Sequence, residues 1–270
     1  MKNLTLQIIP TDLLEQYCSQ LDNSVQKIFE SLHDSDLSLP AGKAGIDAFS
    51  FYTSVSAVFS SKIEGENIEL DSYIKHKRLG AHFLPDYTRK IDDLYDAYLF
   101  AQQTKFSPTN LERVHALLTK HILQLAQQGK FRTVNMFVVT KDGKIEYVAA
   151  APGTVKIEMK KLYADIELLL ATELNFKEVL FFAAMIHLVF VKIHPFEDGN
   201  GRTSRLLEKW FIAQKSGANA WFIQSEKNYY TQHQTYYTNI RRLGLEYEEL
   251  KYSDALPFLL MLPQSITQQP

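Results

Sequence analysis

The sequence has little cysteine and no long, uninterrupted apolar run. Cys18 is the single cysteine among 270 residues, so no disulfide framework exists, and we expect a reducing, cytoplasmic location. The start, Met1 to Leu6, lacks the apolar core and cleavage site of a secretory signal. The most apolar segment, Val179 to Ile193, is interrupted by His187 and Lys192. It is too short to span a bilayer and indicates a buried central helix.

An excess of charge of one sign is also missing. There are 29 Lys and Arg against 31 Asp and Glu, which gives a net charge of −2. This balance offers no electrostatic argument for nucleic acid or an anionic membrane as a partner. Hydrophobic residues make up 46% of the chain, enough for a sizeable core.

Helical periodicity dominates the sequence, and we expect a mainly α fold. A single β-hairpin is predicted at residues 134–149, where two β-branched runs flank the turn residues Lys141-Asp142-Gly143. Pro40 and Gly42 indicate a linker at 37–45, and the tail from Pro263 is expected to fray. The remaining apolar stripes predict helices over residues 13–32, 46–65, 91–99, 107–129, 154–169, 179–193 and 228–242.

The most informative segment is residues 194–205, which reads HPFEDGNGRTSR. Pro195 disfavours helix at His194, while Gly199 and Gly201 permit a tight turn close to a ligand. Apolar spacing further along predicts a helix that starts right after the glycines and ends near Gly217. Because the first turn of a helix has unpaired N–H groups and a positive dipole, this start would bind an anion such as phosphate.

The side chains of this segment suit phosphate chemistry. Arg202 and Arg205 are three residues apart and can each grip phosphate oxygens bidentately. Asp198 suits Mg²⁺, which takes few carboxylates and keeps several waters. His194 can accept a hydroxyl proton as a neutral imidazole. The alternatives are a solvated charge cluster, or zinc bound near His187, for which no HExxH motif or cysteine pair is present.

The segment matches the signature of the Fic family, HPFx[D/E]GNGRxxR, at every defined position. Fic enzymes transfer AMP from ATP to a hydroxyl group of a target protein. The resemblance implies that His194 is the catalytic base and that Asp198 binds Mg²⁺, with ATP as co-substrate. His115 and His187 are interpreted as packed core histidines instead.

The resemblance also assigns the nucleotide phosphates to residues of this segment. Asn200 and the amides of Gly199 and Gly201 would hold them, and Arg202 and Arg205 would bind the β- and γ-phosphates.

A second motif lies in the predicted helix at 46–65. The sequence SSKIEG resembles the Fic inhibitory motif [S/T]xxxE[G/N], with Ser60, Glu64 and Gly65 in the defined positions. A glutamate against Arg205 would occupy the guanidinium that the γ-phosphate of ATP needs. Without the family, a serine and a solvated glutamate at a helix end would be the simpler interpretation.

The hairpin has two interpretations as well: an ordinary structural element, or the flap that in Fic proteins pairs with an extended segment of the target. We expect three regions: a helical region at 1–85 with the inhibitory helix, a Fic core at 86–245, and a C-terminal helix and tail at 246–270.

The sequence thus predicts an autoinhibited protein adenylyltransferase. Removal of AMP from a target, alone or as a second activity of one enzyme, is the alternative chemistry, with Glu64 orienting a water. An ATP-binding regulatory module with negligible turnover is the alternative of another class. The target, its acceptor residue and a homo-oligomeric state stay open.

Overall fold

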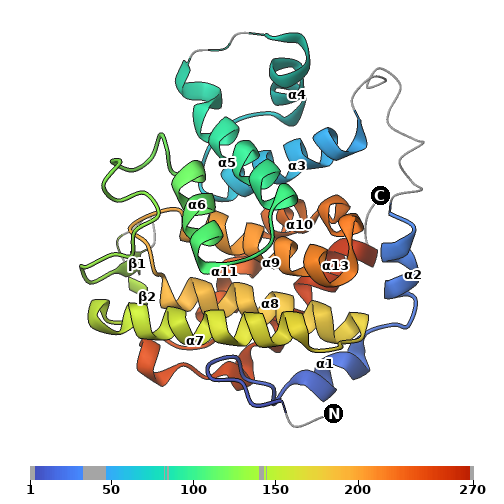
Figure 1. Cartoon of the computed structure of the whole chain (residues 1–270), viewed down its shortest axis with the longest axis vertical. Helices are drawn as coiled ribbons and strands as arrows, with labels where there is room; N and C mark the ends of the chain where they lie inside the picture. Colours follow the sequence, from blue (N-terminus) through green and yellow to red (C-terminus); the bar gives the residue numbers. More distant parts are fainter. Residues whose placement is uncertain are drawn as a thin grey trace.

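The computed structural model describes residues 4–32, 47–81, 83, 85–139, 143 and 145–267. Helices surround a central helix, α8 (Phe176–Ile193), and the described residues form one two-stranded sheet at the side of the molecule (Figure 1). The predicted fold class, mainly α with one β-hairpin, is confirmed.

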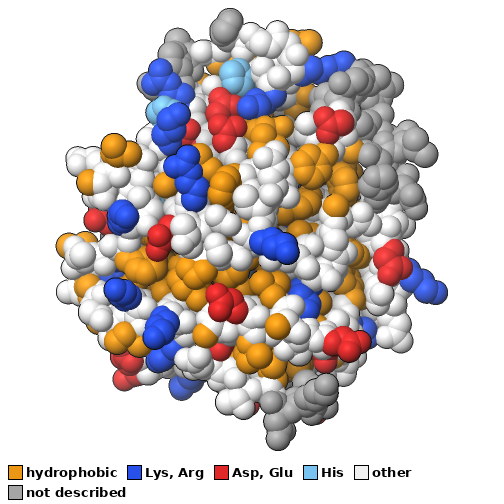
Figure 2. Space-filling model, in the orientation of Figure 1, with side chains coloured by type: hydrophobic (Ala, Val, Ile, Leu, Met, Phe, Trp, Pro, Cys, Tyr) orange, Lys and Arg blue, Asp and Glu red, His pale blue; other side chains and the backbone are white. Residues whose placement is uncertain are grey.

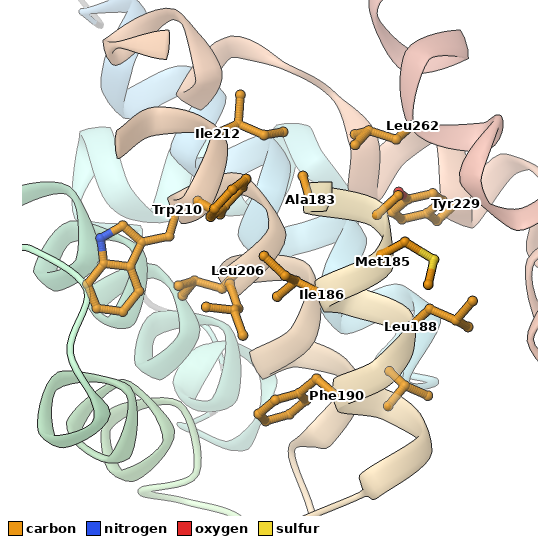
Figure 3. Packing of buried hydrophobic residues seen from close by; sticks show 14 of the residues in the cluster. Ala183, Met185, Ile186, Leu188, Phe190, Leu206, Trp210, Ile212, Tyr229 and Leu262 are labelled. Atoms are coloured by element: carbon orange, nitrogen blue, oxygen red, sulfur yellow. The ribbon is translucent and has the colours of Figure 1, made fainter. Parts of the chain in front are cut away.

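Helix α8 is central because its sequence is apolar on every face. Asn175 and Glu178 form a capping box at its start, and from Val179 to Ile193 every residue is buried. Its main neighbour is α9 (Asn200–Ser216), which ends at Gly217 as predicted. Figure 3 shows Ile186 of α8 facing Leu206 of α9. The segment from His194 to Gly199 therefore connects two helices that are fixed by the core.

The other helices cover this pair. Helix α3 packs against α5 and α10, and α7 and α1 pack on α8. None of the helices within the described ranges is long and apolar enough to cross a membrane. The remaining elements are α1 (Leu14–Gln20), α2 (Val25–Glu30), α3 (Ala48–Ile63), α4 (Leu70–Leu79), α5 (Pro85–Gln103), α6 (Pro108–Leu118), α7 (Pro152–Ala171), η2 (Ala218–Phe222), α10 (Ser225–Thr231), α11 (His233–Arg241), η3 (Tyr247–Glu249), η4 (Tyr252–Asp254), α12 (Leu256–Leu259) and α13 (Met261–Thr267).

The hairpin is shorter than the predicted 134–149. Strand β1 (Phe137–Val139) pairs antiparallel with β2 (Ile145–Val148), with Phe137 opposite Val148. The far side of β2 is partly covered, because the N–H of Val148 donates to the carbonyl of Leu245 at 2.7 Å. Strand β1 is the outer strand of this two-stranded sheet.

Two predicted helices are each broken in two. The stretch 13–32 divides into α1 and α2 because the Asp22 carboxylate accepts from the N–H of Ser24, a local turn that competes with the helix. The stretch 228–242 divides into α10 and α11 at Gln232. Apolar spacing continues across both breaks, so periodicity alone does not reveal them.

Two predicted boundaries were also wrong. Helix α6 ends at Leu118 rather than near Gly129, and the chain then turns, with the N–H groups of Ile122 and Leu123 both donating to the carbonyl of Thr119 at 2.9 Å. The tail from Pro263 is helical and largely buried through Thr267 instead of frayed. The predicted linker at 37–45 lies outside the described residues.

Candidate active site

The segment between α8 and α9 begins in an unusual backbone conformation. His194 has φ 52° and ψ 60°, and it is the one residue other than glycine with positive φ in the described ranges. Such a conformation costs about 1–3 kcal/mol and persists only where the surroundings enforce it. Positive-φ residues of this kind concentrate at functional sites.

A buried arginine enforces this conformation. Nε of Arg132 donates to the carbonyl of His194 at 2.7 Å, and the N–H of Arg132 donates to the carbonyl of Pro195 at 2.9 Å. Its Nη1 donates to the carbonyl of Val134 at 2.7 Å, and Nη2 donates to that of Ala150. Arg132 thus ties both ends of the hairpin region to the segment after α8. Sequence reasoning missed it, because its partners His194 and Pro195 lie more than 60 residues away.

His115 supports the segment after α8 through contacts with Phe196 and Asp198. The N–H of Gly129 donates to Nδ1 of His115 at 2.9 Å, so the ring proton is on Nε2, which donates to the carbonyl of Asp198 at 2.9 Å. The ring stacks on Phe196 with centroids 3.6 Å apart. Burial lowers the pKa of His115 to about 4. His115 is a buried core histidine as predicted, and it supports the active-site segment directly.

Asn200 is placed differently from its expected role. Its side chain accepts from the N–H of Phe196 at 2.9 Å and donates to the carbonyl of Phe196 at 2.8 Å. Both polar groups of the side chain are therefore used to close the turn before α9. Gly199 must be glycine there, because a Cβ would lie 2.7 Å from Cγ2 of Thr119.

His194 presents one ring nitrogen to the protein. Nδ1 lies 3.3 Å from the carbonyl oxygen of Val191 and 3.1 Å from the hydroxyl of Tyr147. Burial, with a smaller contribution from the charge of Arg132, lowers the pKa of His194 to about 4. The imidazole is therefore neutral at pH 7 and can accept a proton.

The first turn of α9 already holds a carboxylate. Oε1 of Glu64 is 2.6 Å from Nη2 of Arg205, and it would lie 2.5 Å from a Cβ added at Gly201. Burial alone would raise the pKa of Glu64, but the charges of Arg205 and Arg202 outweigh it and lower that pKa. The structure thus brings together Glu64 and Arg205, which are 141 positions apart in the sequence.

Arg205 is held on several sides. Ser60 accepts from it twice, through its hydroxyl at 2.8 Å from Nε and through its carbonyl at 3.1 Å from Nη2. The hydroxyl of Tyr236 lies 3.4 Å from Nη1, and it also contacts Nε2 of the buried His187 at 2.9 Å. Nδ1 of His187 contacts the carboxylate of Glu208 at 2.8 Å. His187 is a core residue as predicted, within a polar network that sequence reasoning did not find.

Arg202 has one satisfied and one unsatisfied group. Its Nη2 donates to Oδ1 of Asp198 at 2.8 Å, and the Asp198 side chain is 50% exposed. Its Nε is buried and has no hydrogen-bond partner among the described residues. An unpaired buried donor of a charged group costs roughly 1–3 kcal/mol, so this position favours an added anion.

The region matched to known proteins contains this geometry. Residues 105–212, from just before α6 into α9, match the family described as Fic/DOC. The matched region includes the hairpin and the segment from His194 to Arg205, whereas Ser60 and Glu64 lie outside it.

Curated Fic relatives resemble part of this chain. The protein named Protein adenylyltransferase Fic from Nematostella vectensis is 34% identical over 94 residues, 35% of this chain and 20% of the relative. The protein of the same name from Culex quinquefasciatus is 34% identical over 98 residues, 36% of this chain and 18% of the relative. The aligned segment therefore spans about a fifth of the length of these relatives.

Solved Fic structures share the fold over nearly the whole chain. A Fic family protein from Desulfovibrio desulfuricans G20 has a TM-score of 0.70 at 16% identity, covering 92% of this chain and 74% of that one. A Fic domain containing signaling protein from Bacteroides thetaiotaomicron has a TM-score of 0.65 at 18% identity, covering 90% and 93%. Fic-1 from C. elegans has a TM-score of 0.62 at 18% identity, covering 94% and 72%. At these identities the likeness concerns the fold alone.

Proposed function

We propose that this protein is an autoinhibited protein adenylyltransferase, which transfers AMP from ATP to a hydroxyl side chain of a target protein. One observation carries the proposal: the carboxylate of Glu64 lies at the first turn of α9, over Gly201 and against Arg205. A polyphosphate would use the same N–H groups and the same guanidinium. The names of the curated relatives agree with this chemistry.

The residues of the segment can be given roles in that reaction. The acceptor oxygen would bond to the α-phosphorus while the bond from phosphorus to the bridging oxygen breaks, and pyrophosphate would leave. The proton would pass to Nε2 of His194, whose depressed pKa keeps it neutral. The N–H groups of Asn200 and Gly201 would face the phosphates, and Arg205 would bind the outer ones, whereas the N–H of Gly199 donates to Oδ1 of Asp198.

Arg202 and Asp198 would form the outer edge of the nucleotide site. The unpaired Nε of Arg202 supports binding of a phosphate oxygen there. Asp198 is half exposed, and the described residues contain no group of three His, Cys, Asp or Glu that could hold a metal. A single accessible carboxylate fits Mg²⁺, which when bound would spread the negative charge of the phosphates.

The hairpin supports a docking role for the target. Phe137, Val139 and Ile145 are apolar yet about half exposed, at 49%, 55% and 51%. Strand β1 is the outer strand, so an extended target segment could pair with it. Pairing through main-chain atoms would place the acceptor hydroxyl near His194 and would require little of the side chains that flank it in the target.

Inhibition would come from competition for one guanidinium. With Glu64 on Arg205, ATP could bind only with its outer phosphates displaced, away from the in-line arrangement. Replacing a hydrogen bond between charged groups removes about 1.5–3 kcal/mol, equivalent to roughly 10- to 100-fold in rate. Glu64→Gly should therefore raise AMP transfer by about that factor.

The test uses ATP labelled on the α-phosphate and follows label on the protein itself and on lysate proteins. Glu64→Gly is compared with the double variant that also carries His194→Ala. Glu66→Gly is the matched control, since Glu66 bonds Lys90 at 2.7 Å instead of Arg205. Label that depends on His194 and rises only with Glu64→Gly is expected.

Other outcomes would redirect the assignment. Equal labelling by wild type and Glu64→Gly would end the autoinhibition claim. No His194-dependent label despite ATP binding would contradict transfer. Release of AMP from a modified target by the wild-type protein, lost in Glu64→Gly, would favour the reverse, hydrolytic activity.

A further inference from the structure

The last turn of α8 contains a carbonyl that loses its helical hydrogen-bond donor because of the sequence that follows. In a regular helix the carbonyl of Val191 would accept from the N–H of residue 195, but that residue is Pro195 and has no N–H. The helix does continue to Ile193, and the N–H of His194 donates to the carbonyl of Phe190. Val191 is buried, so its carbonyl needs a donor from elsewhere in the fold.

That donor comes from the hairpin. Tyr147 of β2 is 3% exposed, and its hydroxyl donates to the carbonyl oxygen of Val191 at 3.1 Å. The same hydroxyl lies 3.1 Å from Nδ1 of His194. A tyrosine hydroxyl has one hydrogen to donate, so while that hydrogen is on Val191 the hydroxyl oxygen can only accept from His194.

This arrangement fixes the imidazole tautomer. Nδ1 of His194 faces two oxygens, the hydroxyl of Tyr147 and the carbonyl of Val191, and both are satisfied if Nδ1 carries the proton. Nε2 is then left with a lone pair. If Tyr147 instead donated to Nδ1, the proton would be on Nε2, and the carbonyl of Val191 would lose both donors.

Tyr147 is itself held in place. Nζ of the buried Lys192 lies 4.2 Å from the centroid of its ring, a cation–π contact. The next residue, Val148, is bonded to Leu245 at the base of the hairpin. The hydroxyl position is therefore set by how the hairpin is seated on α8.

We propose that Tyr147 is a positioning residue, which holds His194 in the Nδ1–H tautomer and makes that tautomer depend on the seating of the hairpin. The inference rests on the proposed function for its effect on rate, but the tautomer itself is a property of the free protein. A target segment that presses the hairpin against α8 would stabilise the same hydrogen bonds. Docking and activation of the base would then be one event.

Two measurements on Tyr147→Phe test the proposal, and the ring is retained so that the contact with Lys192 persists. The first is ¹⁵N NMR of histidine-labelled protein, with the His194 signal assigned by its loss in His194→Ala. We expect a protonated Nδ1 in the wild type and a mixture of tautomers in the variant, because only the longer contact of 3.3 Å with the carbonyl of Val191 then holds the proton on Nδ1. An unchanged tautomer in Tyr147→Phe would overturn the proposal, whether or not AMP transfer is ever detected.

The second measurement is transfer kinetics in the Glu64→Gly background. Tyr147→Phe should lower kcat by about 10- to 100-fold while KM for ATP stays within about twofold, since only the base is affected. The matched control is Tyr163→Phe, because the Tyr163 hydroxyl is buried without a hydrogen-bond partner in the described part of the chain. Equal rates for Tyr147→Phe and its parent, or equal losses in both variants, would overturn the proposal.

Discussion

The two sides of the candidate active site are held by different kinds of interaction. On one side, the segment from His194 to Gly199 joins α8 to α9 and is fixed by apolar packing and by hydrogen bonds to backbone. On the other side, the end of α3 meets α9 through side chains, with Ser60 and Glu64 on Arg205 and Ser56 on Lys209. Apolar packing cannot be exchanged for a ligand, whereas a charged contact can be replaced by a phosphate. The packed segment is therefore expected to be rigid, whereas a phosphate could displace the side chains of α3 from Arg205.

The packed side should show the largest effect on stability. Phe196→Ala removes a fully buried ring that stacks on His115, and we expect the free energy of unfolding to fall by about 3–5 kcal/mol. Urea denaturation of the two proteins measures it. Phe137→Ala on the exposed hairpin is the control, with an expected change below about 0.5 kcal/mol. Similar losses for both variants would contradict the assigned difference in packing.

Acid should destabilise the packed side, because the buried His115 is neutral in the folded protein. The pKa of His115 is lowered from 6.5 to about 4, so the folded state binds fewer protons than the unfolded state between these values. Its stability contribution is complete above pH 6.5 and is lost as the pH falls toward 4, by up to about 3 kcal/mol.

Thermal denaturation of His115→Gln between pH 8 and 4 checks this expectation. The variant should lose part of the acid-induced decrease, and the remainder is expected from His194, whose pKa is also lowered to about 4. An identical pH dependence in variant and wild type would rule out His115 as a source.

On the polar side, the loss of a single hydroxyl group should already change AMP transfer. Ser60→Ala removes the hydroxyl that accepts from Nε of Arg205, and this costs about 1.5–3 kcal/mol because the donor is charged. We expect basal AMP transfer to rise, though less than in Glu64→Gly, since the carboxylate stays. Labelling assays on the two variants in parallel show which of them transfers AMP faster. Ser50→Ala, at the exposed start of α3, should leave transfer unchanged.

The rim of the site should show the smallest effect on stability. Asp198 is 50% exposed, although its partner Arg202 is buried, and an asparagine at this position keeps an oxygen that can accept from Nη2 of Arg202. The free energy of unfolding of Asp198→Asn should therefore lie within about 0.5 kcal/mol of the wild-type value. AMP transfer in the Glu64→Gly background should nevertheless fall at least about 10-fold. Titration with Mg²⁺ in both proteins separates a metal role from a structural one. Equal Mg²⁺ dependence would contradict the role proposed for Asp198.

Local chemistry was enough to predict several elements. The apolar run ending before Pro195 predicted the buried helix that became α8, and Gly217 marked the end of α9. Ser107 and Pro108 correctly marked the start of α6. These signals work because caps, proline and glycine act on neighbouring residues. The breaks at Leu21 and Gln232 escaped prediction, since apolar spacing continues through them.

The contact of Glu64 with Arg205 was expected from a resemblance and not from local physics. Nothing near Glu64 in the sequence distinguishes it from a solvated glutamate at a helix end. Its inhibitory role stays a prediction, which the structure makes specific by placing the carboxylate over Gly201.

The sequence by itself determined where α8 ends and where α9 begins, because Pro195, Gly199 and Gly201 limit the backbone whatever surrounds them. Only the tertiary structure decided which distant groups meet that segment. Arg132 bonds the carbonyl of His194, and Tyr147 bonds that of Val191, from 62 and 44 residues away. A sequence can show that a carbonyl loses its helical donor. The partner that replaces the donor depends on how the hairpin packs against α8.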